Sequence, residues 1–317
     1  MTAYAESVRG AVPVESLGFV LSHEHVFLRS PGFAENYPRT FPREEVVTIA
    51  SRDLRGYREK GVSTIVDMTT VDLGRDVSIL AEVSRASGVN IIAATGSYTG
   101  IPTFFQPRSA ERIAELFIAD LTEGVAGTAI KAGVIKCSMD EPEMTVQHQK
   151  LIESAVIAHK ASGAPISTHS SAVNRTGLMQ AKAIEALGAN MQKVIIGHSG
   201  DTTDLDYLYE LLETGCTLGL DRFGLEEFLP TAERCRVVAA LCDGGFGNRI
   251  VLSHDSFCFN DSVSRRFRDE HLASWRMDFL VDDVLPTLRQ QGVLPSDIEL
   301  MTIVNPARVF GLERQAG

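Results

Sequence analysis

The sequence predicts a single (β/α)8 barrel domain over residues 1–317. Two patterns predict it: eight short runs rich in β-branched residues, and stretches of helical length with spaced apolar residues between them. Many of the helical stretches end at a glycine, which readily adopts the left-handed conformation that closes a helix. Eight such units could also form a doubly wound open sheet, but the barrel (a TIM barrel) accommodates them without a domain boundary.

The expected strands are nearly all apolar, as parallel strands covered on both faces should be. In chain order they are residues 18–22, 63–68, 90–96, 133–137, 165–169, 194–198, 217–222 and 249–255. In the stretches expected to be helices, apolar residues recur at spacings of three and four. These stretches are residues 43–60, 109–123, 146–161, 203–213, 231–242 and 278–291.

A long insertion, residues 256–277, separates the last strand from the helical stretch that follows it. Because loops of this length in a compact domain are usually functional, we expect it to form a lid over the barrel. An extra C-terminal helix is expected at residues 296–310, where Ser296 can cap the N-terminus and Glu299 follows three residues later.

The composition is that of an acidic globular protein. The net charge is −11, and a hydrophobic share of 44% excludes disorder over most of the chain. An acidic surface does not attract a phosphate backbone or an anionic leaflet, so we expect no nucleic-acid or membrane binding. Residues 1–10 lack an apolar segment, so we expect no signal peptide. The five cysteines form no Cys-x-x-Cys pair, which indicates reduced thiols and a cytoplasmic location.

Side chains that can bind metal ions gather where the expected strands end, and this end of such a barrel is where catalytic residues lie. Residues alternate between the two faces of a strand, so His23 and His25 can both face the interior while Glu24 points away. The other candidates end four further strands: Lys136, His169, His198 and Asp255.

These residue types predict a metal centre. A single barrel histidine is more often a hydrogen-bonded core residue, but chance would rarely place the whole set at strand ends. Imidazole and carboxylate groups bind divalent Zn, Fe, Co or Mn, and four histidines with Asp255 exceed what one ion requires. Two ions need an anion between them. Burial and nearby cations favour the neutral amine of Lys136, which can form a bridging carbamate with carbon dioxide.

We expect the other polar residues near these positions to have structural roles or to lie in solvent. His254 alternates with Asp255, so it should face away from the interior as an orienting partner. His148 and His159 lie among polar neighbours on an expected helix and should be solvated. Asp201 is expected to cap the helix that follows it.

Five segments around the strand ends together form a recognisable set. They are Ser22-His23-Glu24-His25-Val26, Gly133-Val134-Ile135-Lys136-Cys137, Pro165-Ile166-Ser167-Thr168-His169, Ile196-Gly197-His198-Ser199-Gly200-Asp201 and Leu252-Ser253-His254-Asp255. In this order, and over nearly the whole chain, they resemble the phosphotriesterase family of the amidohydrolase superfamily. The resemblance implies a (β/α)8 barrel that holds two divalent metal ions.

The resemblance also assigns each ligand to an ion. The implied ligands are His23, His25 and Asp255 for the more buried ion, and His169 and His198 for the more exposed one. A carboxylated Lys136 and a hydroxide bridge the two ions in that arrangement, with zinc as the first expectation.

Two features resemble the phosphotriesterase-like lactonases more than the triesterases of the family. Tyr98 matches the tyrosine of the lactonase branch, where triesterases carry tryptophan. Asp221-Arg222-Phe223-Gly224 resembles a lactonase motif at a strand end where triesterases have a histidine. One departure concerns chain length. Residues 257–261 lack the tryptophan often found in lactonases that act on long-chain acyl-homoserine lactones, and Trp275 resembles a second, later tryptophan of the family.

The resemblance therefore implies hydrolysis of acyl-homoserine lactones or other γ- and δ-lactones, with weak hydrolysis of organophosphate triesters. A metal-bridging hydroxide would attack the carbonyl carbon, and Asp255 would pass its proton to the leaving alkoxide. Tyr98 would donate a hydrogen bond to the substrate or simply line the pocket. Arg222 would either bind substrate or fix the neighbouring loops by a structural pairing.

Three alternatives to a lactonase remain. The first is a primary organophosphate triesterase (an aryldialkylphosphatase) or another esterase on the same site. A mononuclear deaminase would lack a bridging lysine, so Lys136 disfavours it, and a non-catalytic binding protein would normally have lost ligands. The resemblance also implies a homodimer acting on a small-molecule lactone or ester.

Overall fold

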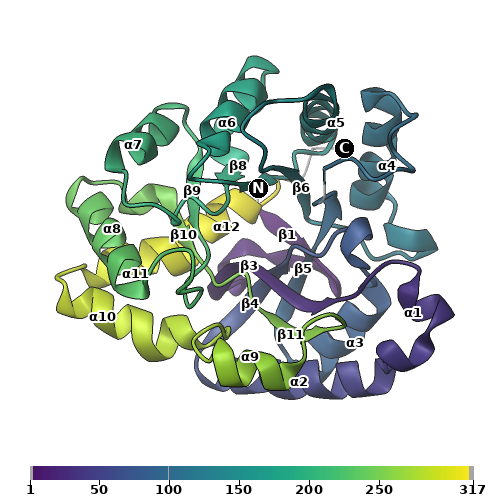
Figure 1. Cartoon of the computed structure of the whole chain (residues 1–317), viewed down its shortest axis with the longest axis horizontal. Helices are drawn as coiled ribbons and strands as arrows, with labels where there is room; N and C mark the ends of the chain where they lie inside the picture. Colours follow the sequence, from purple (N-terminus) through teal and green to yellow (C-terminus); the bar gives the residue numbers. More distant parts are fainter. Residues whose placement is uncertain (1–2, 99, 314–317) are drawn as a thin grey trace.

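The computed structural model describes residues 3–98 and 100–313. It shows parallel strands curled into a barrel with helices around the outside (Figure 1). The strand order is β10-β9-β8-β7-β6-β5-β4-β3-β11, which confirms the expected barrel. The strands are β3 (Phe19–Leu28), β4 (Val62–Asp67), β5 (Asn90–Gly96), β6 (Val134–Met139), β7 (Ile166–Ser170), β8 (Val194–Ile196), β9 (Thr217–Leu220), β10 (Ile250–Leu252) and β11 (Phe257–Asn260).

The eighth strand of the barrel is split into β10, which pairs with β9, and β11, which pairs with β3. Between them, the backbone N–H of Asp255 donates to the carbonyl of His23 at 3.0 Å. The backbone N–H of His25 donates to the carbonyl of Ser256 at 2.8 Å. These bonds close the barrel, so the start of the expected lid is a strand, and the rest of the lid contains the short helix α9 (Arg265–His271).

Two site residues lie outside the strands to which the sequence pattern assigned them. β3 continues through both of its histidines to Leu28, whereas β8 and β10 stop before His198 and Asp255. Both of these residues have left-handed backbone, with φ of 57° for His198 and 55° for Asp255. His198 lies in a turn, and the side chains of both residues contact other predicted site residues at the mouth of the barrel. Such conformations in residues other than glycine cluster at functional sites.

Helices alternate with the strands, and their apolar faces pack against the outside of the barrel in one large cluster. The barrel helices are α2 (Arg43–Glu59), α3 (Val77–Ser87), α4 (Ala110–Thr122), α5 (Val146–Ser162), α6 (Thr176–Ala186), α7 (Leu205–Glu213), α8 (Thr231–Asp243) and α10 (Leu285–Gln290), the last preceded by a π-helical turn over Leu280–Val284. Of these, α3 and α6 were not among the expected ranges. In the described ranges, none of the helices combines the length and apolarity needed to cross a bilayer.

Apolar side chains close the end of the barrel opposite the site. Val20, Val66 and Ile92 from three strands pack with Val309 and Phe310 of α12 (Asn305–Phe310). The expected C-terminal helix is present as α11 (Pro295–Glu299), a π-helical stretch (Leu300–Val304) and α12, which crosses behind the barrel in Figure 1. An N-terminal hairpin, β1 (Tyr4–Ser7) with β2 (Gly10–Pro13), was not expected; β1 also lies against β5.

Candidate active site

His23 and His25 face the barrel interior from β3, and both are buried. Glu24 lies between them and faces the other way, where it is also buried. Its carboxylate accepts hydrogen bonds from Ser253, His254 and Ser256 in the segment that joins β10 to β11. One strand thus presents two imidazoles to the interior, while the residue between them anchors the closing segment.

Asp255 completes a group with the two histidines of β3. Its Oδ1 lies 3.3 Å from Nε2 of His23 and 3.2 Å from Nε2 of His25. The three donor atoms all lie within 4.8 Å of one another, a spacing at which they could hold one metal ion. On the far side of the second ring, Nδ1 of His25 lies 2.9 Å from the hydroxyl oxygen of Thr69. Because that hydroxyl donates to the carbonyl of Phe27, it accepts from His25, which leaves Nε2 with its lone pair.

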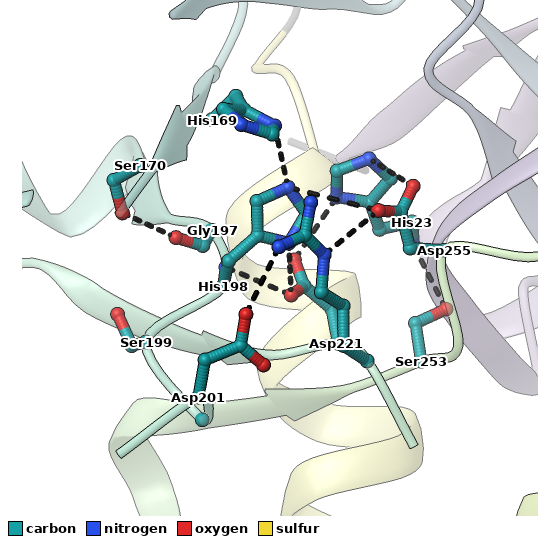
Figure 2. Close-up of polar contacts among 12 residues, drawn as sticks. His23, His169, Ser170, Gly197, His198, Ser199, Asp201, Asp221, Ser253 and Asp255 are labelled. Carbon is teal, nitrogen blue, oxygen red and sulfur yellow. Dashed lines mark hydrogen bonds and ion pairs between the residues drawn. The ribbon is translucent and has the colours of Figure 1, made fainter. Parts of the chain in front are cut away.

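His169 and His198 form the second half of the site. Nε2 of His198 lies 2.8 Å from Nδ1 of His169 (Figure 2). Burial lowers the pKa of both rings, so both are neutral at pH 7. Nδ1 of His198 donates to Asp221, and Nε2 of His169 donates to Asp140. The two facing nitrogens therefore both carry lone pairs, which repel one another unless a cation lies between them. This donor chemistry fits a metal ion.

Asp221 was not among the predicted site residues, and it connects the two halves. It follows β9, is buried, and accepts hydrogen bonds from Nδ1 of His23 and from Nδ1 of His198, each at 2.9 Å. Burial alone would raise the pKa of Asp221, but the two histidines hold it well below its ordinary value. A carboxylate partner of this kind fixes the tautomer and orientation of a metal-binding histidine. Its position at a strand end, level with the predicted ligands, was a signal that could have identified it.

Lys136 lies on β6 and is fully buried in the same interior. Its Nζ is 3.4 Å from Nε2 of His23 and 3.3 Å from the carbonyl oxygen of Thr168. Burial lowers the pKa of Lys136 to about 8. A neutral amine is therefore accessible near physiological pH, as the formation of a carbamate requires.

Arg222 pairs with carboxylates of two neighbouring loops. Its Nε donates to Oδ2 of Asp255 at 3.0 Å, and its Nη1 donates to Oδ2 of Asp201 at 2.9 Å. Asp201 also accepts from the buried Arg234 at 2.6 Å, so it does not cap the next helix as expected. That role belongs to Asp204, which accepts from the third residue of α7. Of the two roles considered for Arg222, these contacts are those of the structural pairing.

A hollow of about 340 Å³ is lined by several of the side chains that could hold a metal ion. Its floor includes His23, His25, Lys136 and Asp255, and its walls are largely apolar. The apolar wall residues are Leu28, Leu73, Leu225, Phe228, Leu272 and Trp275, the last two from the expected lid. A second, more polar hollow of about 380 Å³ includes His169, Asp140 and residues 170–174.

Tyr98 lies where the two hollows meet and lines both. Its ring packs edge-on against the ring of His169, with the centroids 4.8 Å apart. Burial raises the pKa of Tyr98, so its hydroxyl stays protonated and can donate a hydrogen bond to a bound molecule. The structure thus places all of the predicted site residues around one mouth.

The other histidines divide into one confirmed expectation and one correction. His254 faces away from the interior, as expected, with Nδ1 2.6 Å from Glu24 and Nε2 accepting from the backbone N–H of Leu280. His148 and His159 were expected to be solvated, but both are buried. His148 belongs to a capping box at the start of α5, and His159 hydrogen-bonds the carbonyl of Ala164, just beyond the end of that helix, and the backbone N–H of Asn190. Polar neighbours in sequence did not reveal these partners.

Comparisons with known proteins agree with this architecture. The model of the Phosphotriesterase family matches residues 4–310. A "Phosphotriesterase homology protein" of Mycobacterium tuberculosis is 38% identical over 98% of both chains. An "Aryldialkylphosphatase" of Saccharolobus solfataricus is 35% identical over 95% of this chain and 98% of the other. The solved structure of the phosphotriesterase from Mycobacterium tuberculosis superposes with a TM-score of 0.93 at 37% identity, covering 97% of this chain and 98% of that one.

Proposed function

The chain belongs to the phosphotriesterase family of binuclear metal hydrolases, and from this premise we propose that it opens lactones. The substrates we propose are acyl-homoserine lactones or other γ- and δ-lactones, with weak hydrolysis of organophosphate triesters. The observation that carries this proposal is the apolar hollow directly above the metal-binding side chains. A neutral ester with an apolar substituent can bury that substituent against the walls while its carbonyl group reaches the floor.

Two divalent ions would be held by the side chains on this floor together with His169 and His198 beside it. We assign one ion to His23, His25 and Asp255, and the other to His169 and His198. Carboxylation of Lys136 would supply the anion that both ions share, and zinc is the first candidate among the ions that suit these donors. Bound there, the ions would supply hydroxide at neutral pH and polarise the substrate carbonyl.

The protein's own groups would orient the reaction and move its proton. Asp255 would accept the proton of the attacking hydroxide and deliver it to the leaving alkoxide, which yields a hydroxy acid. Arg222 would hold Asp255 in position through the 3.0 Å hydrogen bond to Oδ2. Tyr98 would donate a hydrogen bond to an oxygen of the substrate. Its place between the two hollows, beside His169, supports that role.

Primary organophosphate triester hydrolysis is the second candidate. It is favoured by the 35% identity to a protein named aryldialkylphosphatase, and a phosphoryl oxygen fits the same polarising site as a carbonyl oxygen. The two candidates are separated by kcat/KM for γ-lactones, δ-lactones, acyl-homoserine lactones and paraoxon, measured on one preparation of defined metal content. A higher value for lactones supports the first proposal, and a higher value for paraoxon replaces it with the second.

A further inference from the structure

Asp140 contacts a predicted metal ligand from outside the barrel interior. It follows the last residue of β6, and its Oδ2 lies 2.8 Å from Nε2 of His169. The side chain of Asp140 is 57% exposed, whereas that of His169 is 5% exposed. The backbone of Asp140 is itself held, because its carbonyl accepts a hydrogen bond from the side chain of Asn174 at 2.9 Å. The loop that follows β6 thus supports a predicted metal ligand, His169, on β7.

This contact decides which nitrogen His169 presents to the site. Because Nε2–H is donated to the carboxylate, the lone pair is on Nδ1, which faces His198. His23 and His198 present the opposite nitrogen, Nε2, because both donate Nδ1–H to Asp221. A carboxylate that accepts from a metal-binding histidine fixes the ring and makes its other nitrogen a stronger ligand.

The carboxylates that accept hydrogen bonds from His169 and His198, the two predicted ligands of the second ion, differ in their exposure to solvent. Asp221, which holds His198, is 1% exposed, so water and salt barely screen its hydrogen bond. Asp140 is mostly exposed, so its hold on His169 is weaker and depends on salt.

We propose that Asp140 is a positioning residue that sets the affinity of the ion bound by His169 and His198. By this inference the Asp140 contact strengthens the binding of that ion, and added salt reduces its contribution because the carboxylate is exposed. The inference rests on the two-ion site of the proposed function, but it concerns ion binding and does not depend on the substrate.

The neighbouring Glu141 offers a matched control. It has the same charge, lies in the same loop, and its carboxylate contacts a histidine, His148, at 3.0 Å. His148 belongs to the capping box of α5 and lies outside the predicted ligand set. A general effect of lost negative charge near the mouth would therefore appear in Glu141→Ala as well as in Asp140→Ala. An effect of holding His169 would appear only in the latter.

The test is a Zn²⁺ titration of metal-stripped protein in buffers of graded free Zn²⁺, with bound ions counted per chain. We expect Asp140→Ala to weaken the second ion about 10-fold and to leave the first unchanged. Asp140→Asn, which keeps an acceptor but loses the charge, should lie between Asp140→Ala and the wild type. In Co²⁺-loaded protein, the visible absorption of the second ion should shift in Asp140→Ala and remain unchanged in Glu141→Ala.

Three results would overturn the inference. In the first, Asp140→Ala binds both ions as tightly as Glu141→Ala does. In the second, both ions weaken equally in Asp140→Ala, which indicates a general loss of structure that thermal unfolding of the stripped proteins would also report. In the third, the wild type itself binds only one ion. That result also removes the two-ion site of the proposed function, whereas the first two leave it standing.

Discussion

Asp221 accepts a hydrogen bond from Nδ1 of His198 at 2.9 Å and holds that ring with Nε2 toward the site. The other oxygen of the same buried carboxylate holds His23, which belongs to the other half of the ligand set. One side chain beyond the end of β9 therefore orients a histidine for each proposed ion, and its loss should affect both.

Asp221→Asn should accordingly weaken the binding of both ions. An amide has a single acceptor oxygen, so it can satisfy only one of the two ring N–H groups and leaves the other buried without a partner. We expect affinities for Zn²⁺ to fall about 10- to 100-fold for each ion. Metal content after dialysis against graded chelator measures this, with the wild type retaining close to two ions per chain. Full retention of both ions by the variant would contradict the shared role.

Lys136→Ala should abolish hydrolysis, because it removes the group proposed to supply the shared anion. Short carboxylic acids such as acetate or propionate should restore part of the activity, since they can occupy the vacated space and provide a carboxylate. Cys137→Ala is the control: Cys137 is the next residue on β6, is equally buried, and packs in the cluster outside the barrel interior. An active Lys136→Ala enzyme without added acid would refute the bridging role.

The return of activity when Zn²⁺ is added to metal-stripped protein should depend on pH through Lys136. Burial lowers the pKa of this amine from 10.5 to about 8, so the neutral, reactive form increases as pH rises through 8. At pH 7 about a tenth of the amine is neutral. At constant dissolved carbon dioxide and Zn²⁺, the rate at which activity returns should therefore increase between pH 6.5 and 8.5 and then level off. A rate that is flat or falls over this interval would argue against carboxylation.

Tyr98→Phe should impair lactones more than phosphotriesters. The variant keeps the ring that packs on His169 and removes only the hydroxyl. Loss of one hydrogen bond to the substrate costs roughly 1 kcal/mol, or about fivefold in kcat/KM. The comparison uses one lactone and paraoxon on the same two enzymes. Equal losses of kcat/KM on both substrates would mean that Tyr98 only lines the pocket.

Gly224→Ala should displace the end of the expected lid around Ser274 and Trp275. Gly224 has φ of +89°, and a Cβ there would lie 2.1 Å from the carbonyl oxygen of Ser274, next to Trp275. Gly245 has a similar φ of +83°, but a Cβ there meets nothing within 4 Å. Gly245→Ala therefore carries the backbone cost of about 1 kcal/mol without the clash. We expect Gly224→Ala to lower Tm further than Gly245→Ala and to reduce kcat/KM, which the control should not do.

The predictions that succeeded depended on periodicities that the chain carries locally. Alternation along β3 placed His23 and His25 on one face and Glu24 on the other, because side chains in a strand point alternately to opposite faces. The apolar runs of the other strands located their C-terminal ends to within a few residues, although β8 and β10 stop before His198 and Asp255. In a parallel barrel those ends meet at one mouth. Six separated residues could therefore be assigned to one site without any knowledge of the distances between them.

The same patterns did not predict which side chains would pair with one another. The pairing of Asp221 with His23 joins side chains 198 positions apart, and that of Arg222 with Asp255 joins side chains 33 positions apart. The split of the eighth strand, and the hydrogen bond that His159 accepts from the backbone N–H of Asn190, 31 positions away, likewise depend on contacts that no local spacing encodes.

The sequence by itself determined the barrel, the level at which its chemistry lies and the residues that converge there. Tertiary structure alone decided which nitrogen each histidine presents, which carboxylate holds it, and how far water reaches that carboxylate. The physical reason is that strand and helix periods set the direction of a side chain relative to its own backbone, whereas a hydrogen bond depends on where a second backbone lies.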